Sequence, residues 1–414
     1  MDETPFFCYN VVEMASNVHF CARWGKVVGM MAVMSAVLFV PDDTGKTEYP
    51  RPLMLTRVLG VPLLAWLANA LFTGGVGRFF LVCHERFVKE AVACLPEGAE
   101  IMTSMDSVPA DLLHVFLSTA DDCEQMVDII AAPALYLPHL KPRGQAAAGA
   151  FRVSREALMT ALDEKFSFTR FMRENCTVLS DSDGFHAVDS PEALPEAAEL
   201  LRRDRALGLI KKGVQLDDPA NCIVEPTVCV EKGARLLSGT ILHGKTLVRE
   251  GAVIGPWSMI ADSEIGAGAV VNASQISDCK LAAGVSVGPY SRLRDGAVLE
   301  RGAAIGNFVE IKNSHVGENT RAAHLTYLGD AQIGADCNFG CGSVTVNFDR
   351  KEKHPTSIGE GAFIGCNASL VAPVRLGNGA FVAAGSVITE DVPDNALAIA
   401  RARQSVKKDW AKNK

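Results

Sequence analysis

Cysteine is the first residue type to consider for chemistry, because its thiolate is both a nucleophile and a metal ligand. The chain has twelve cysteines, and none of them forms a Cys-x-x-Cys motif. The two nearest in sequence, Cys337 and Cys341, have no cluster of other metal-ligand residues beside them. Free cysteines are most often core residues of cytoplasmic proteins. We therefore expect reduced, mostly buried thiols, a cytoplasmic protein and no metal site.

The tripeptide Gly45-Lys46-Thr47 resembles the end of a phosphate-binding loop of the Walker type. That motif also requires a glycine earlier in the chain, with four residues between it and the Gly-Lys-Thr. The required position is occupied by Val40. The sequence therefore does not predict such a loop.

His324 is the candidate general base, since imidazole is the side chain best suited to take a proton near neutral pH. An isolated histidine is nevertheless more often a structural residue. Isolated cations such as Arg294, Lys312 and Lys353 are likewise more often solvated surface charges. What these residues do depends on the elements that position them and on the motifs that surround them.

Length and composition restrict the classes of protein. The chain has 414 residues, of which 48% are apolar and 21% charged, and a formal net charge of −8. These values favour two or three globular domains and give no basic footprint for a nucleic-acid partner. The apolar run Val27–Val40 has 14 residues, which is fewer than the roughly 20 needed to cross a bilayer. We expect no membrane span, and expect the end of this run to be a buried strand.

A six-residue repeat fills the second half of the chain, from about residue 222 to 398. Aliphatic residues recur at intervals of six, often followed by glycine; the two clearest series are Val287, Leu293, Leu299, Ile305, Ile311 and Ile358, Ile364, Leu370, Leu376, Val382, Ile388. This period fits neither a helix nor a simple alternating strand. It predicts a β-helix, in which each unit is one short strand and one corner. The phase slips around 347–355, which predicts an inserted loop there, and such loops often carry function.

The region before the repeat reads as a separate α/β domain. Apolar strands are expected at 37–40, 79–83 and 127–131, and helices at 61–72 and 88–94. Such alternation predicts a mostly parallel sheet. Leucine and alanine spacing over 191–213, with Glu early and Lys or Arg late, predicts a connecting helix. The expected domains are thus 1–190, a helix 191–213, a β-helix 214–400 and a tail 401–414.

Several long motifs in the repeat region resemble one enzyme family. They are Gly306–Lys312, Ala323–Ala331, Leu370–Val374 and Asn395–Arg401, with Gln404 and Trp410 in the tail. All resemble the acetyltransferase half of bacterial bifunctional UDP-N-acetylglucosamine pyrophosphorylase/glucosamine-1-phosphate N-acetyltransferases. The resemblance implies a left-handed parallel β-helix, a homotrimer, and acetyl-CoA bound between coils of neighbouring subunits. The left-handedness comes from the resemblance alone, because the usual crossover rule is right-handed.

The resemblance also implies roles for individual residues. His324 matches the family's catalytic base, and Glu310 matches the carboxylate that helps to orient it. The sugar-phosphate positions are Arg294, Lys312, Tyr327, Asn338 and Lys353. The acetyl-CoA positions are Cys341, Asn347, Phe348, Cys366, Ala384 and Arg401. The chain departs from the family pattern at four places, where Phe348 replaces a Tyr, Cys341 an Ala, Cys366 a Ser and Pro355 a Lys.

The first domain resembles a truncated, Rossmann-like uridyltransferase domain that has lost its reaction. Gly60–Leu64 keeps one family motif, but the phosphate loop has become Pro41–Thr47, with two carboxylates where a triphosphate should bind. The family's Mg²⁺-binding Asp is missing, since the matching stretch reads Ala131–Leu135. The sugar-binding insert is also largely absent before Gly149. We therefore expect neither a Mg²⁺ site nor uridylyl transfer.

These observations predict acetyl-CoA-dependent N-acetylation of glucosamine 1-phosphate, a step in UDP-N-acetylglucosamine biosynthesis for peptidoglycan and lipopolysaccharide. Two alternatives remain open. One is a bifunctional enzyme that still uridylylates, and the other is a non-catalytic hexapeptide-repeat scaffold or regulator. The exact amino-sugar acceptor and the role of the first domain also remain open.

Overall fold

The computed structural model describes residues 34–47, 50–105, 108–120, 124–142, 146–163, 171 and 174–413. The first part of the apolar run Val27–Val40, up to residue 33, lies outside the described residues. The chain divides into two compact units, Met1–Ala197 and Ala198–Lys414. The boundary falls inside α8 (Leu194–Lys211), the helix that the sequence predicts between the domains. None of the described helices is long and apolar enough to cross a membrane.

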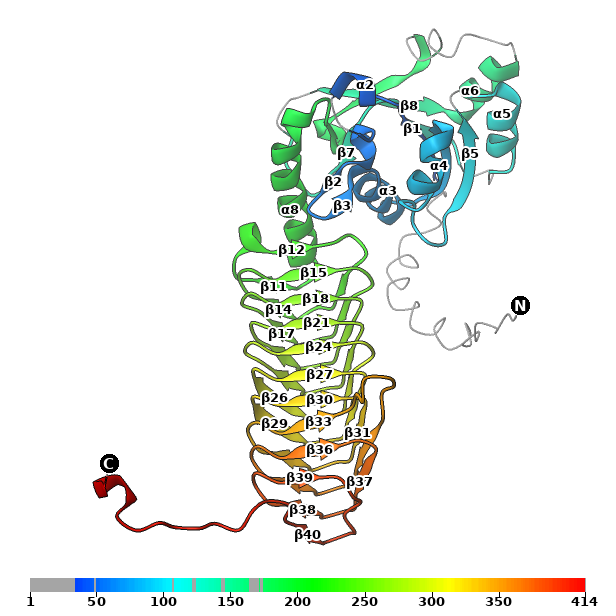
Figure 1. Cartoon of the computed structure of the whole chain (residues 1–414). Coiled ribbons are helices and arrows are strands. Elements are labelled where there is room, and N and C mark those ends of the chain that lie inside the picture. Colours follow the sequence, from blue (N-terminus) through cyan, green and yellow to red (C-terminus); the bar gives the residue numbers. More distant parts are fainter. Residues whose placement is uncertain are drawn as a thin grey trace, which may run out of the picture. The chain divides into compact units, whose positions relative to one another are not determined.

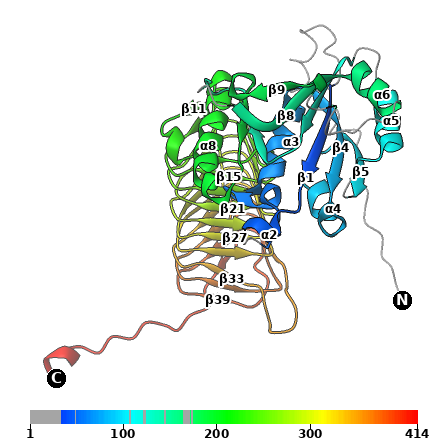
Figure 2. The same ribbon diagram turned by 90° about the horizontal axis from the view of Figure 1, so that it is seen from above.

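A six-stranded sheet forms the centre of the first unit, in the order β5-β4-β1-β6-β8-β9. Its strands are β1 (Met34–Val40), β4 (Val76–Cys83), β5 (Glu100–Met105), β6 (Met126–Ile130), β8 (Ala146–Ser154) and β9 (Thr177–Ser180). β1, β4 and β5 run side by side in parallel (Figure 2), and β6 continues this parallel part, whereas β8 and β9 pair antiparallel. The parallel core is the Rossmann-like architecture that the alternating pattern predicts.

The remaining elements of this unit are short. The helices are α2 (Thr44–Thr47), α3 (Leu63–Thr73), α4 (Glu85–Val92), α5 (Ala110–Ser118) and α6 (Arg155–Asp163). Two small sheets pair β2 (Arg57–Val58) with β3 (Val61–Pro62), and β7 (Ala134–Tyr136) with β10 (Phe185–Ala187). Single 3-10 turns of this unit lie at Leu53–Leu55, Asp181–Asp183 and Pro191–Ala193, and two more lie in the second unit, at Pro219–Asn221 and Trp410–Asn413.

Two predicted helix boundaries are wrong. The helix expected to start at residue 61 begins at Leu63, because Val61 and Pro62 pair with β2 in a short antiparallel hairpin. The helix expected at 88–94 begins earlier, at Glu85, and the side chain of His84 accepts a hydrogen bond from the backbone N–H of Arg86 at its start. Capping of this kind is set by a local contact that hydrophobic spacing alone does not reveal.

The second unit is the left-handed parallel β-helix, built from three sheets that run its length (Figure 1). The eleven-stranded sheet contains β11 (Gln215–Leu216), β14 (Arg235–Leu236), β17 (Val253–Ile254), β20 (Val270–Val271), β23 (Ser286–Val287), β26 (Ala304–Asn307), β29 (Arg321–His324), β32 (Asn338–Phe339), β35 (Phe363–Ile364), β38 (Phe381–Val382) and β40 (Leu397–Ala398). The ten-stranded sheet contains β12 (Ile223–Val224), β15 (Ile241–His243), β18 (Met259–Ala261), β21 (Gln275–Ser277), β24 (Arg292–Arg294), β27 (Glu310–Lys312), β30 (Tyr327–Gly329), β33 (Val344–Val346), β36 (Ser369–Val371) and β39 (Val387–Ile388). The nine-stranded sheet contains β13 (Cys229–Val230), β16 (Leu247–Val248), β19 (Glu264–Ile265), β22 (Lys280–Leu281), β25 (Val298–Leu299), β28 (His315–Val316), β31 (Ala331–Ile333), β34 (Thr356–Ile358) and β37 (Val374–Leu376).

The aliphatic series of the repeat form the core of this β-helix. All eleven of the residues quoted for the two series are buried and belong to one apolar cluster. Residues on successive coils stack in register, as Leu293, Ile311 and Leu328 do. Because each strand has one inward aliphatic, its outward neighbours are free to vary. These outward positions carry the candidate site.

Candidate functional site

The inserted loop expected from the phase slip lies between β33 and β34. Its two sides meet in an antiparallel bridge between Phe348 and Lys353. Inside it, the Asp349 carboxylate accepts hydrogen bonds from two backbone N–H groups, including that of Glu352 at 2.8 Å, and contacts the imidazole of His354 at 2.9 Å. These contacts, first of all the one from Glu352, lower the pKa of Asp349. The loop is thus internally fixed, and it holds Lys353 at a defined place.

Three cations from different segments converge beside this loop. Arg294 on β24 and Lys312 on β27 are direct neighbours in the ten-stranded sheet. The amine of Lys353 from the loop lies close enough to that of Lys312 for each to shift the pKa of the other. Two carboxylates lie against these cations: Glu310 is 2.8 Å from Arg294, and Asp295 is 2.8 Å from Arg294 and 3.6 Å from Lys312. One carboxylate therefore faces two of the three cations.

The two amines affect each other's protonation. Contact with Lys312, followed by the charge of that residue, lowers the pKa of Lys353. The interaction with Lys353 raises the pKa of Lys312. Two ammonium groups held in contact repel each other, and an anion placed between them removes that repulsion. The arrangement is typical of a site for a phosphate or another small anion.

Glu310 belongs to the same cluster of charges. It lies on β27, and its Oε1 accepts hydrogen bonds from Arg294 at 2.8 Å. This bond fixes the direction of the guanidinium group and, as the largest cause, raises the pKa of Arg294. Within the described part of the chain, no contact joins Glu310 to His324. The carboxylate expected to orient the base is therefore held by a cation in the single chain.

Tyr327 and Asn347 line the same corner. The Nδ2 group of Asn347 donates to Asp330 at 2.5 Å and lies 3.5 Å from the Tyr327 hydroxyl. Gly329, between them on β30, leaves the necessary room: an added Cβ would collide with the Tyr327 hydroxyl and lie 2.7 Å from Asn347 Nδ2. Asn347 is 7% exposed, so its position is set by packing as well as by hydrogen bonds.

His324 lies at the end of β29, on the eleven-stranded sheet, and is exposed. Among the described residues, no hydrogen bond or ion pair engages its imidazole. The ladder places Asn307 before it and Cys341, Cys366 and Ala384 after it on successive coils. Backbone hydrogen bonds of 2.8 Å join these coils. Asn367, after Cys366, donates to the Cys341 carbonyl, and Gly385, after Ala384, donates to the Cys366 carbonyl.

The predicted site residues thus fall into two groups. Arg294, Lys312, Tyr327, Asn347 and Lys353 gather on the ten-stranded sheet and its loop, together with Glu310. The second group follows the eleven-stranded sheet. Four of its members form one column: His324, Cys341, Cys366 and Ala384. Asn338 lies at the start of β32, and Arg401 follows β40, where its Cδ would lie 3.7 Å from a Cβ added to Gly385. Phe348 lies in the loop and is 57% exposed.

Sequence reasoning missed two acidic members of the first group, Asp295 and Asp330. Both occupy corners with positive φ, 56° and 52°, where Asp is one of the few favoured residues. Both also directly follow residues of the quoted pattern, Arg294 and Gly329, and that adjacency is the signal that could have found them.

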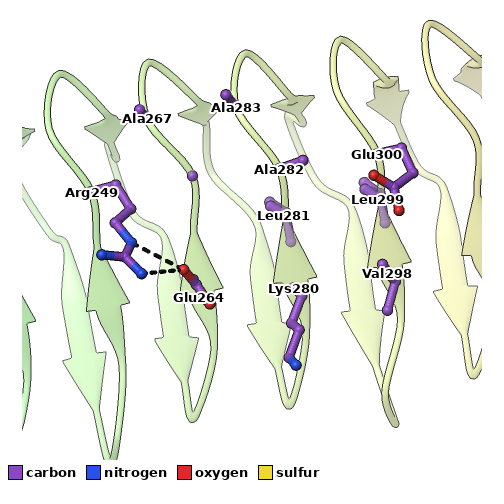
Figure 3. A pocket seen from close by; sticks show the side chains of 11 residues that line it. Arg249, Glu264, Ala267, Lys280, Leu281, Ala282, Ala283, Val298, Leu299 and Glu300 are labelled. Atoms are coloured by element: carbon purple, nitrogen blue, oxygen red, sulfur yellow. Dashed lines mark hydrogen bonds and ion pairs between the residues drawn. The ribbon is translucent and has the colours of Figure 1, made fainter. Parts of the chain in front are cut away.

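The β-helix has a second hollow, on the nine-stranded sheet, which Figure 3 shows. It is a cavity of about 450 Å³ over β16, β19, β22 and β25, with a floor of small residues such as Gly266 and Ala282. Arg249 lies at one end and pairs with Glu264 at 2.7 Å, and Glu300 at the other end contacts His315 at 3.0 Å. We place the candidate site at the cation cluster, because the site residues predicted from the sequence gather there and not at this cavity. Among the described residues, no group of three or more His, Cys, Asp or Glu could hold a metal ion.

Comparison with known proteins bears on this site. The family model of bacterial transferase hexapeptide (six repeats) matches residues 355–390. The chain is 44% identical to the bifunctional protein GlmU of Geobacillus sp. over 223 residues, which is 54% of this chain and 49% of the relative. It is 45% identical to the bifunctional protein GlmU of Thermotoga maritima over 227 residues, 55% of this chain and 51% of the relative. The similarity to GlmU is confirmed. The chain spans about half the length of these relatives.

The loop after β1 contains the two carboxylates of the stretch Pro41–Thr47, and Asp42 and Asp43 both have partners within the chain. Asp42 accepts hydrogen bonds from Thr44 Oγ1 at 2.7 Å and from Arg86 at 2.5 Å. These contacts, the Thr44 hydroxyl first, lower the pKa of Asp42. Arg51, also in this unit, pairs with Glu90 at 2.7 Å. The cations at this edge of the sheet are therefore neutralised within the chain.

The position matched with the family's Mg²⁺-binding Asp is also covered. Ala132 packs so closely against Gly149 that a Cβ added to the glycine would overlap that of the alanine. Gly149 has a φ of +88°, and its carbonyl accepts a hydrogen bond from Ala131. The backbone of β8 thus occupies the space beside Ala132.

Proposed function

We propose that this chain transfers the acetyl group of acetyl-CoA to the amine of glucosamine 1-phosphate, giving N-acetylglucosamine 1-phosphate. The observation that carries the proposal is the cluster of Arg294, Lys312 and Lys353, in which the two lysine amines lie close enough to shift each other's pKa. A phosphate monoester is close to doubly charged at neutral pH, since its second pKa is about 6. Its oxygens would relieve the repulsion between the amines and accept the fork of Arg294.

The chemistry requires an uncharged amine. In the proposed reaction the amine nitrogen forms a bond to the thioester carbonyl carbon, and the imidazole of His324 takes the amine proton. The carbon–sulfur bond then breaks, and the departing thiolate of CoA takes up a proton. Asn347, with an N–H group at the site, supports the negative charge on the carbonyl oxygen in between.

The column of residues after His324 suits a long, thin cosubstrate. Cys341, Cys366 and Ala384 have small side chains, and the last two are exposed. They leave room beside the β-helix on three successive coils. We assign this column to acetyl-CoA, with Phe348 near the thioester and Arg401 at the far end.

We further propose that the active assembly is a homotrimer. In one chain, His324 and the cation cluster lie on neighbouring sheets. Among the described residues, no contact joins Glu310 to the imidazole of His324. An apolar edge adjoins His324 at the same corner: Tyr290, Phe308 and Leu325 are 64%, 55% and 55% exposed, and the first two rings stack at 5.7 Å. Exposed apolar edges of this kind are typical of protein interfaces. A neighbouring copy that covers this edge would bring its own cations to His324.

For the first domain we propose that uridylyl transfer is lost. Asp42 and Glu90 neutralise the cations that would meet a nucleotide, and backbone fills the space at Ala132. Without a carboxylate there, a Mg²⁺ ion bridging the phosphates loses a ligand. Another enzyme must then supply the uridylylation step.

The test is release of free thiol from acetyl-CoA, measured with a panel of amino sugars and their 1-phosphates. We expect release with glucosamine 1-phosphate and much less with phosphate-free glucosamine. No release with any sugar would overturn the proposal in favour of a non-catalytic scaffold. Sedimentation of the active species should give a trimer, and an active monomer would contradict the assembly.

A further inference from the structure

Two of the residues that depart from the family pattern, Cys341 and Cys366, stand next to each other in space. Cys341 follows β32 and Cys366 follows β35, and these two strands pair in parallel register. The same register continues beyond the strands. The N–H of Gly340 donates to the Ile364 carbonyl, and the N–H of Asn367 donates to the Cys341 carbonyl at 2.8 Å. The two cysteines are therefore ladder neighbours on adjacent coils.

Their spacing suits a disulfide. Neighbouring strands lie about 4.8 Å apart, and disulfides join Cα atoms about 4.4–6.8 Å apart. The Cys366 sulfur lies 2.9 Å from where a Cβ on Gly340 would be, so it leans toward the coil that carries Cys341. Because Gly340 has no side chain, this space stays open to the sulfur.

The two thiols are accessible, which separates them from the other cysteines of this part of the β-helix. Cys366 is exposed and Cys341 is half-buried. Cys337 is nearer to Cys341 in sequence, but it is buried and its thiol donates to the Gly359 carbonyl at 3.0 Å. Burial also raises the pKa of Cys337 and that of Cys279. A thiol that is buried and slow to ionise is a poor nucleophile.

We infer that Cys341 and Cys366 form a thiol–disulfide exchange site, at which a low-molecular-weight disulfide oxidises the pair to a bridge between two coils. The site lies in the same column as His324, one and two coils further along. Its position on the acetyl-CoA track rests on the proposed function.

The exchange balances in two steps. The Cys366 thiolate attacks one sulfur of the disulfide RSSR, so that a Cys366–SR bond forms and RS⁻ leaves with the thiol proton. The Cys341 thiolate then attacks the Cys366 sulfur, and the second RS⁻ leaves with the second proton. Two protein thiols and one RSSR thus give one protein disulfide and two RSH. A dithiol reverses the sequence.

The experiment uses the full chain, first reduced and then freed of reductant, with glutathione disulfide as the oxidant. Peptide mapping by mass spectrometry without reductant should show the peptide of Cys341 linked to that of Cys366, lighter by two hydrogen atoms than the reduced pair. Dithiothreitol should restore both free thiols. Cys341→Ala should instead retain a glutathione adduct on Cys366, and Cys366→Ser should form no bridge. Absence of the linked peptide in the natural chain would overturn the inference.

Two further measurements test whether the bridge is specific and whether it lies on the acetyl-CoA track. Cys229→Ser, at another half-buried cysteine, should form the bridge at the rate of the natural chain. Acetyl-CoA at ten times its dissociation constant leaves about one site in eleven free, so it should slow the bridge about tenfold. A bridge that forms equally fast with acetyl-CoA present would overturn its placement on the track. Both readouts are independent of acetyl transfer, so an inactive chain would refute the proposed function without affecting the bridge.

Discussion

Replacing His324 by alanine separates catalysis from folding more cleanly than any other change at this site. The imidazole is exposed, and no hydrogen bond or ion pair holds it within the described residues. Its removal should therefore change the free energy of unfolding by less than about 0.5 kcal/mol, as at ordinary surface positions. A positioned general base contributes about 10²–10⁴ in rate. That loss corresponds to about 2.7–5.4 kcal/mol of transition-state stabilisation.

The assay compares kcat for acetyl transfer, the melting temperature and acetyl-CoA binding in the natural chain and in His324→Ala. His315→Ala is the matched control, because His315 is also at the surface of the β-helix but pairs with Glu300. We expect the control to keep its kcat and His324→Ala to keep its melting temperature. Activity of the natural chain should fall as the pH is lowered, since a protonated amine has no lone pair with which to attack the thioester. A higher pH should partly restore the variant. Near-normal turnover by His324→Ala at neutral pH would refute the role of the base.

Three further predictions follow from the structure. Lys312→Ala should raise KM for glucosamine 1-phosphate while leaving the slow reaction of phosphate-free glucosamine unchanged, and equal losses with both sugars would contradict the phosphate site. Because the pKa of Lys353 is lowered, Lys353 loses its charge at a lower pH than an ordinary lysine does. KM for the sugar phosphate should therefore increase as the pH is raised through this range. Lys353→Arg should abolish the increase, because arginine keeps its charge. Neither the natural chain nor Ala132→Asp should make UDP-N-acetylglucosamine from UTP, Mg²⁺ and N-acetylglucosamine 1-phosphate, as measured by chromatography, and robust product from either would show that the first domain is active.

The β-helix could be predicted in detail because its periodicity is a direct consequence of burial. Each coil places one aliphatic residue per face inside, so residues such as Leu293 and Ile311 recur at a fixed interval whatever the outward residues are. The inserted loop at 347–355 was visible for the same reason, since it interrupts that interval. Helix ends in the first domain were less accurate. The end of a helix is set by single contacts, such as the bond between His84 and Arg86, which no period records.

The pairing of charges could not be predicted, because it depends on which outward residues share a level in the ladder. Two carboxylates in the first loop were expected to repel a triphosphate as free charges. In the structure, Asp42 is bound by Thr44 and Arg86, and Asp43 accepts the N–H of Leu53 at 3.0 Å. The two carboxylates are therefore not free charges, because each already has a partner within the chain.

The cations of the two units differ in their charged neighbours, and this difference is the strongest structural argument about function. In the first domain, Arg51 and Arg86 each have a carboxylate partner, so an added phosphate would have to displace it. In the β-helix, Lys312 and Lys353 lie close together, and the Asp295 carboxylate is 3.6 Å from Lys312. Holding like charges together destabilises a folded chain unless an anion compensates. The free energy that such an anion would recover is available for binding at the β-helix site, and the first domain offers no comparable gain.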